Sequence, residues 1–299
     1  MMQVLSATIV GIALSLVLGG CRLPGLEGPV SRSLATSRQL CQQGVSAMEH
    51  QQWQRAEQLL QQAVRTCSAD PDARRNYAEA LWHRGARQEA VAQLEEAARL
   101  APGDPLLEVR LAEMRLAMDQ PARAMRHAER ALELAPRLPA AWTMRGRVLQ
   151  ANGQAREALA AYHRAMGYGP ADRSIPLEIA ELYGQIGEPQ RALVTLQTLA
   201  EAYSPGEEPQ RLLLLEGIAH QALGRYEEAI ESFSAANARI PPSPEALYHL
   251  AECQLALGRR QEAAAAAREA LALAPHDQAS RELLSRIELA QQPDFPAKR

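Results

Sequence analysis

Few of the reactive side chains in this 299-residue sequence are spaced as a catalytic or metal site requires. His249 and Cys253 are four residues apart, so on a helix they would share a face, and Glu79 and His83 have the same spacing. Two such ligands without a third make a poor zinc site. The sequence also lacks the common motifs of zinc proteases, of glycine-rich phosphate-binding loops and of catalytic nucleophiles. We therefore expect no enzymatic activity, catalytic residue, metal or cofactor, and no small-molecule substrate is evident.

The composition favours helices over sheets. Hydrophobic residues make up 47% of the chain but aromatic residues only 4%, so most of the apolar content is alanine and leucine. Alanine and leucine are strong helix formers, whereas sandwiches and barrels depend on β-branched and aromatic residues. The net charge of −3 also lacks the basic surplus that nucleic-acid binding needs.

The elements that would position any site repeat along the chain. Alanine recurs at intervals of 34 residues, once lengthened to 37, at Ala56, Ala90, Ala124, Ala158, Ala192, Ala229 and Ala263. A glycine lies five residues before most of these alanines, as Gly85 does, and a proline or serine twelve residues after, as Pro102 does. Each interval therefore fits two short helices joined by a glycine turn. The three added residues, within 203–209, predict a lengthened surface loop, with a hinge or contact point as the alternative.

This pattern resembles the tetratricopeptide repeat (TPR), and the copy with Trp142, Gly146 and Tyr162 matches it most fully. The resemblance implies an all-α, α-α superhelix of about seven helix-turn-helix repeats over residues 37–276. A capping helix over 277–291 and a disordered tail over 292–299 would follow. The repeats are expected to begin near Ser37, Pro71, Pro105, Pro139, Arg173, Gln210 and Pro244.

The N-terminus predicts export. Residues 4–20 contain no charge, and the run is too short for an ordinary membrane-spanning helix. Its ending, Leu18-Gly19-Gly20-Cys21, resembles the lipobox of bacterial lipoproteins. The resemblance implies a signal peptide over 1–20, then lipid-modified Cys21 and a flexible tether over 21–36. It also implies a site in the bacterial cell envelope facing the periplasm, with the outer membrane favoured because Arg22 replaces the aspartate of inner-membrane retention. The first three residues contain no Lys or Arg, so an uncleaved anchor or a soluble protein remains the alternative.

A disulfide between Cys41 and Cys67 is one expectation for the first repeat. Cys41 is expected near the start of the first helix and Cys67 just after the end of the second, and these ends are neighbours in an antiparallel hairpin. Export would place both residues in an oxidising compartment. The alternative is a pair of free, half-buried thiols.

The TPR resemblance also implies a binding face. In that family the first helix of each repeat lines the concave surface. The matching residues here include Arg75, Glu79, Trp82, Glu113, Arg147, Glu181, Tyr248 and Glu252. Trp82 and Tyr248 are the candidate anchors, since aromatic side chains dominate interface energetics. For any single residue of this set, solvated surface or packing within the repeat is the alternative.

These features predict an exported, lipid-anchored scaffold that binds envelope proteins or peptides through its concave face. The alternative is a structural accessory subunit of a pilus, secretion or polysaccharide-export assembly. The lysine and asparagine clamp with which some TPR co-chaperones hold a C-terminal carboxylate is missing. The first two repeats have Cys41, Val45, Arg75 and Glu79 at the matching positions.

Overall fold

The computed structural model describes residues 29–169, 172 and 174–291 of the chain. Within these residues the regular structure is entirely helical. The helices are α1 (Pro29–Glu49), α2 (Trp53–Thr66), α3 (Pro71–His83), α4 (Arg87–Leu100), α5 (Pro105–Ala117), α6 (Pro121–Leu134), α7 (Pro139–Ala151), α8 (Ala155–Tyr168), α9 (Ile175–Gln185), α10 (Pro189–Ala200), α11 (Gln210–Ala222), α12 (Tyr226–Asn237), α13 (Pro244–Ala256), α14 (Arg260–Leu273) and α15 (Gln278–Gln291).

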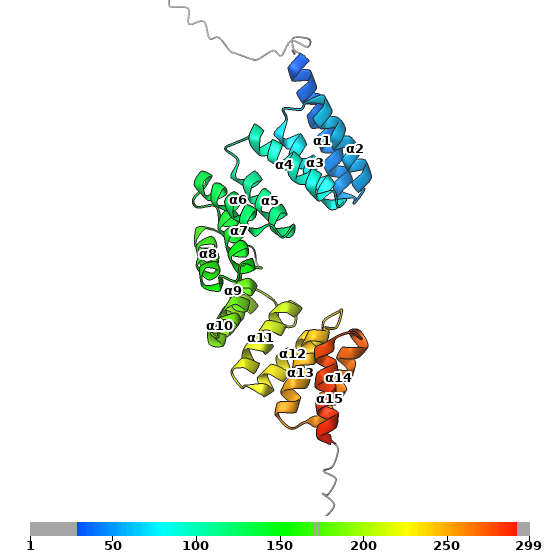
Figure 1. Ribbon diagram of the computed structural model, residues 1–299, viewed down its shortest axis with the longest axis vertical. Helices are drawn as coiled ribbons and strands as arrows, with labels where there is room; N and C mark the ends of the chain where they lie inside the picture. The colour runs from blue at the N-terminus through cyan, green and yellow to red at the C-terminus, as the bar shows by residue number, and fades with distance from the viewer. Residues whose placement is uncertain (1–28, 170–171, 173, 292–299) are drawn as a thin grey trace, which may run out of the picture.

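The helices form seven hairpins, from α1 with α2 to α13 with α14, and α15 packs against the last hairpin. The hairpins follow one another along a curved path from the N-terminal to the C-terminal end (Figure 1). The expected all-α superhelix of helix-turn-helix repeats with a C-terminal capping helix is therefore confirmed. Stacking makes this architecture stable, because one hairpin alone cannot cover its apolar face.

Close approach of the two helices in each hairpin depends on small residues. Ala90, Ala124, Ala158 and Ala263, which belong to the recurring series, are completely buried. Larger side chains there would push the hairpins apart. Their small size explains why an alanine-rich chain with few aromatic residues builds a continuous core.

The turn inside each hairpin requires a left-handed backbone. Gly85 supplies this conformation in the second repeat, with a φ of 88°. Gln51 and Asp119 occupy the equivalent position in the first and third repeats, with φ values of 58° and 56°. The same turn geometry therefore recurs in these repeats even where the sequence lacks the glycine that favours it.

The start of α1 corrects one expectation. The flexible tether was expected to reach residue 36, but α1 begins at Pro29 and therefore includes residues 29–36. Proline is well tolerated in the first helical turn, where its missing N–H has no helical partner. The hydroxyl of Thr36 donates to the carbonyl of Arg32 over 3.0 Å, as side chains inside a helix commonly do. The expected signal peptide, Cys21, the rest of the tether and the C-terminal tail lie outside the described residues.

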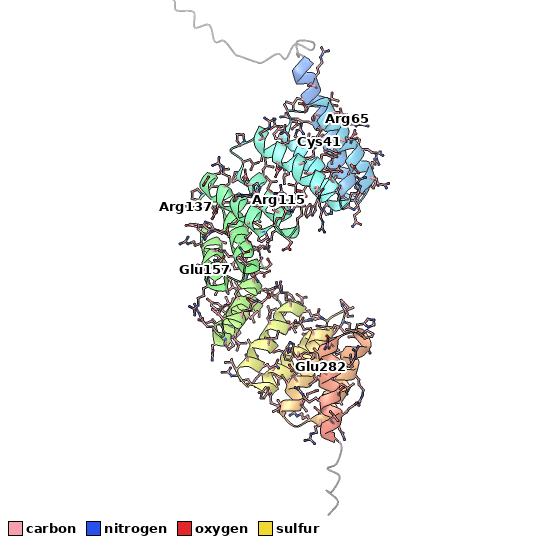
Figure 2. The ribbon with its side chains drawn as sticks, viewed as in Figure 1. Cys41, Arg65, Arg115, Arg137, Glu157 and Glu282 are labelled. Carbon is pink, nitrogen blue, oxygen red and sulfur yellow. The ribbon has the colours of Figure 1, made fainter. Side chains whose placement is uncertain are left out.

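The position of the cysteines corrects a second expectation. Cys41 and Cys67 are both free, and Cys41 is buried. Because α1 begins at Pro29, Cys41 lies in the middle of that helix. It is close to Gly44, which packs against Leu60 of α2. Cys67 follows the end of α2, about two helical turns farther along the hairpin. Figure 2 shows Cys41 within the body of the N-terminal helices.

The lengthened connection between α10 and α11 is tied to the following hairpin. The guanidinium of Arg239, after α12, donates to the carbonyl of Gly206 and lies 3.1 Å from the carboxylate of Glu208. The side-chain amide of Gln210 donates to the carbonyls of Ala236 and Pro241 over 3.0 and 2.9 Å. These contacts hold residues 206–210 against the connection that leads from α12 to α13.

Candidate functional site

The first helices of the repeats form one continuous side of the stack. Close backbone contacts join α1 with α3, α5 with α7, α9 with α11 and α11 with α13, and no pair of second helices among the described residues approaches as extensively. Elements on the inner side of a curved stack lie closer together than those on the outer side. The first helices therefore line the concave side, which we call the concave face, and polar side chains connect neighbouring repeats across it.

The N-terminal part of this face contains an arginine shared by two acids. The guanidinium of Arg110 on α5 donates twice to Glu79 on α3, over 2.8 and 2.7 Å. It also lies 2.7 Å from Glu113, three residues farther along α5. Burial acts to lower the pKa of Arg110, but the hydrogen bonds to Glu79 and Glu113 outweigh it and raise that pKa. Two carboxylates therefore share one guanidinium, so the cluster has a formal charge of one negative in excess.

A hollow lies in the middle of the concave face. Its volume is about 340 Å³, and its lining is formed by Glu113, Leu138, Pro139, Ala140, Thr143, Met144, Arg147 and Asp172. Arg147 lies 3.5 Å from the carboxylate of Asp172, which precedes α9. Hydrogen bonds from the backbone and hydroxyl of Ser174 lower the pKa of Asp172. The hollow thus offers both signs of charge beside apolar side chains.

The C-terminal part of the face is more acidic. Arg211 on α11 lies 2.6 Å from Glu181 and 3.4 Å from Glu178, both on α9. Glu252 on α13 accepts hydrogen bonds from the hydroxyl of Tyr248 over 3.0 Å and from the amide of Gln221 over 3.2 Å. These two donors are neutral. Nδ1 of His249 also lies 3.5 Å from Glu252, but burial lowers the pKa of His249, so a neutral ring leaves the carboxylate charge of Glu252 uncompensated near pH 7.

The eight expected residues do not meet at one place but belong to different parts of the concave face. Glu79 and Glu113 meet at Arg110, and Glu113 and Arg147 line the same hollow. Arg75 pairs with Asp72 in its own helix, 3.2 Å away. The remaining members, Glu181, Tyr248 and Glu252, belong to the C-terminal part.

Trp82 has a structural role in the second repeat. Its ring is partly buried against the N-terminal core, and the guanidinium of Arg87 lies 5.5 Å from the ring centroid. The guanidinium covers one face of the ring and is attracted to its π electrons. The ring therefore takes part in packing inside the repeat, and its role as a binding anchor stays a prediction.

Sequence reasoning missed three charged residues of this face, namely Arg110, Arg211 and Glu178. Arg110 and Glu178 lie outside the helix positions that the family pattern assigns to the groove, whereas Arg211 is the second residue of its repeat, a groove position that was not singled out. For Arg110 and Glu178 the signal in the sequence was local, because Arg110 and Glu113, like Glu178 and Glu181, are spaced for one helix face. Their partners lie about one repeat away in the chain.

The described residues contain no group of three or more metal-ligating side chains that could hold a metal ion. Nor does any helix in the described part of the chain have the length and apolarity needed to cross a membrane.

Comparison with known proteins identifies the fold and the family. The tetratricopeptide repeat model matches residues 41–105, 143–207, 177–244 and 214–278, which together exceed half of the chain. None of the curated protein sequences matches the chain.

Solved structures with similar folds include three TPR-like proteins. A tetratricopeptide repeat protein from Parabacteroides merdae is 15% identical, with 85% of this chain and 99% of that chain covered and a TM-score of 0.64. PilW, described as a type IV pilus biogenesis factor, is 18% identical, with coverage of 72% and 98% and a TM-score of 0.64. YrrB, described as having an unusual peptide-binding site, is 18% identical, with coverage of 63% and 96% and a TM-score of 0.53. The matched repeats and the shared superhelical fold lead to one conclusion: this chain belongs to the tetratricopeptide repeat family.

Proposed function

We propose that this protein is an exported, lipid-anchored scaffold that binds envelope proteins or peptides through its concave face. The observation that carries this proposal is the mixed surface around the hollow between Glu113 and Arg147. Apolar side chains there lie beside a carboxylate and a guanidinium that remain partly exposed, at 35% each. A peptide backbone or side chain can satisfy such groups, and this combination is typical of peptide-binding grooves.

The lipid anchor in this proposal is supported by the sequence before the first helix. The uncharged run over residues 4–20 ends at Leu18-Gly19-Gly20-Cys21, which resembles a lipobox. With Cys21 acylated, the short segment before α1 would hold the repeats close to the membrane surface. Arg22 favours the outer membrane, with the repeats on the periplasmic side.

The second candidate is a structural accessory subunit of a pilus, secretion or polysaccharide-export assembly. The likeness of fold to PilW, described as a type IV pilus biogenesis factor, favours a pilus among these assemblies. The two candidates differ in what the concave face does. A scaffold that recruits partners reversibly keeps this face open when isolated, whereas a permanent subunit is unstable or insoluble without its neighbours.

Two matched alanines allow a direct test of the concave face. A photo-crosslinking amino acid is placed at Ala140, which lines the hollow, or at Ala160, which is exposed on the second helix α8. We expect envelope proteins to be crosslinked in cells from position 140 and not from position 160. Adding Arg147→Ala to the first variant should reduce the crosslinks at least severalfold. Equal crosslinking from both positions would contradict the proposal.

Metabolic labelling tests the anchor separately. Cells that produce the full chain are grown with labelled palmitate, and the Cys21→Ala variant provides the control. We expect the label on the parent chain and its complete loss from the variant. A parent chain without label, or a label that persists in Cys21→Ala, would remove the lipid anchor from the proposal.

A further inference from the structure

The C-terminal half of the concave face differs chemically from the rest, and the difference identifies a class of partner. Resting on the proposed scaffold function, we propose that the face formed by α9, α11 and α13 binds an amphipathic, basic peptide segment. Its lysine or arginine side chains would pair with surplus glutamates, and its apolar side chains would contact an apolar strip on α11 and α13. We call this part of the surface the acidic half-groove.

The floor of the acidic half-groove is apolar. Leu214 and Ile218 are four residues apart on α11, and Tyr248 and Leu255 are seven residues apart on α13. These spacings place each pair along one helix face. All four side chains are only partly buried, where they pack against the core from its concave side. Each therefore retains surface that an apolar ligand side chain would remove from water.

The rim of the acidic half-groove has more acids than bases. Glu178 and Glu181 share the single cation Arg211. Glu252 accepts from two neutral donors and lies 3.5 Å from Nδ1 of His249, and Glu245 is exposed at the start of α13. Neither α9 nor α13 contains a lysine or an arginine. Four carboxylates therefore face one guanidinium, which leaves three negative charges in excess.

The other charged groups around the acidic half-groove do not cancel this excess. His249 on α13 has its pKa lowered by burial, so its ring is neutral near pH 7. From α15, the charge of Arg286 acts on Tyr248 and is opposed there by the charge of Asp277. Burial and the hydrogen bond to Glu252 raise the pKa of Tyr248, so its hydroxyl stays protonated and remains a donor.

Charge complementarity therefore selects a basic occupant. An acidic peptide would meet several like charges at once, whereas an ammonium or guanidinium group would find unused carboxylate lone pairs on Glu181 and Glu252. The N-terminal half of the concave face is closer to balance, because Arg75, Arg110 and Arg147 lie among its acids. The basic segment is thus expected on α9, α11 and α13 and not along the whole face.

The test measures peptide binding to the full chain by fluorescence anisotropy. The probe is a labelled 14-residue helical peptide with leucine on one face and lysine on the other, and matched peptides replace every lysine with glutamate or glutamine. The Glu181→Gln/Glu252→Gln variant removes two surplus charges, while Arg211 keeps its pairing with Glu178. The control variant Glu231→Gln/Glu269→Gln removes two exposed charges from the second helices α12 and α14.

We expect the lysine peptide to bind and the glutamate peptide not to bind. Affinity for the lysine peptide should fall about tenfold in Glu181→Gln/Glu252→Gln, as the loss of two partly exposed ion pairs implies. It should also fall as ionic strength rises and stay unchanged in the control variant. An unchanged affinity in Glu181→Gln/Glu252→Gln would overturn the inference.

The peptide series also separates failure of this inference from failure of the scaffold proposal. Preferential binding of the glutamate or glutamine peptide would overturn the basic partner and leave a peptide-binding face. Failure of all three peptides to bind would overturn the inference, and the scaffold proposal would then be decided by crosslinking from Ala140.

Discussion

Replacing Gly217 with alanine is expected to lower the free energy of unfolding by about 1–3 kcal/mol, the usual effect of overpacking a core. Gly217 lies on α11 against Phe233 of α12, and a Cβ atom there would be 2.5 Å from Cε1 of that ring. The ring is completely buried and stacks on His249, with 5.4 Å between the ring centroids. Because the ring has no room to move away, the methyl group must separate the two helices.

Two further glycines make this expectation specific. Gly146→Ala should have a similar effect, because its Cβ would lie 2.6 Å from Cε1 of Tyr162, whose hydroxyl donates to Gln150 over 2.8 Å. Gly184→Ala is the matched control, since a Cβ there meets nothing within 4 Å. It should stabilise the protein by up to about 1 kcal/mol, the gain from replacing a helical glycine.

Urea unfolding followed by circular dichroism measures these changes. Phe233→Leu in the Gly217→Ala background should recover part of the loss, because the two residues are in contact and their effects are coupled. A Gly217→Ala variant as stable as the parent chain would contradict the close packing of α11 against α12.

Asp70→Ala is expected to lower the free energy of unfolding by about 2–4 kcal/mol, because a helix cap and a buried hydrogen bond are lost together. Asp70 accepts from the backbone N–H groups of Asp72 and Ala73, over 3.1 and 3.3 Å, at the start of α3. The hydroxyl of Ser37 on α1 lies 3.0 Å from the same carboxylate and 3.2 Å from the carbonyl of Ala63 on α2. Both Asp70 and Ser37 are buried, so this pair joins three helices.

Asp104→Ala provides the matched control for this prediction. Asp104 caps α5 before a proline in the same way, but it accepts only from the N–H of Leu106, over 2.9 Å in an exposed position. Its loss should lower stability by about 1 kcal/mol, as for an ordinary cap. Urea unfolding of both variants checks the difference. Equal effects of Asp70→Ala and Asp104→Ala would show that Ser37 adds nothing to the first cap.

The fold of this protein could be predicted almost completely from the interval between its small residues. The recurring alanines, with glycine before them and proline after, specify hairpins of constant length, and such hairpins bury their apolar faces only by stacking. Helices α3, α5, α7, α11 and α13 begin where the repeats were expected to begin. Aromatic residues are scarce for a related reason, since closely packed hairpins leave little room for a ring. The buried rings of Tyr162 and Phe233 fit because a glycine on the facing helix leaves space for each of them.

The sequence was less informative where a side chain depends on a neighbouring repeat. The pairing of Arg110 with Glu79 and that of Arg211 with Glu178 join residues 31 and 33 positions apart in the chain. Whether such residues meet depends on the small rotation between successive hairpins, which the repeat interval does not specify. The cysteines were likewise beyond the reach of the repeat interval, because their pairing depends on how far Cys67, after the end of α2, lies from Cys41 along the hairpin.

The sequence by itself determined the helical class and the hairpin length, because local periodicity controls which residues of each helix are small and buried. The side of the stack on which binding residues are expected came from the resemblance to the tetratricopeptide repeat. Only the tertiary structure decided that Trp82 packs within its repeat, that Glu113 and Arg147 line one hollow, and that three acids remain uncompensated between α9 and α13. These properties arise from the superhelical placement of the hairpins, which brings together side chains that are distant in the chain.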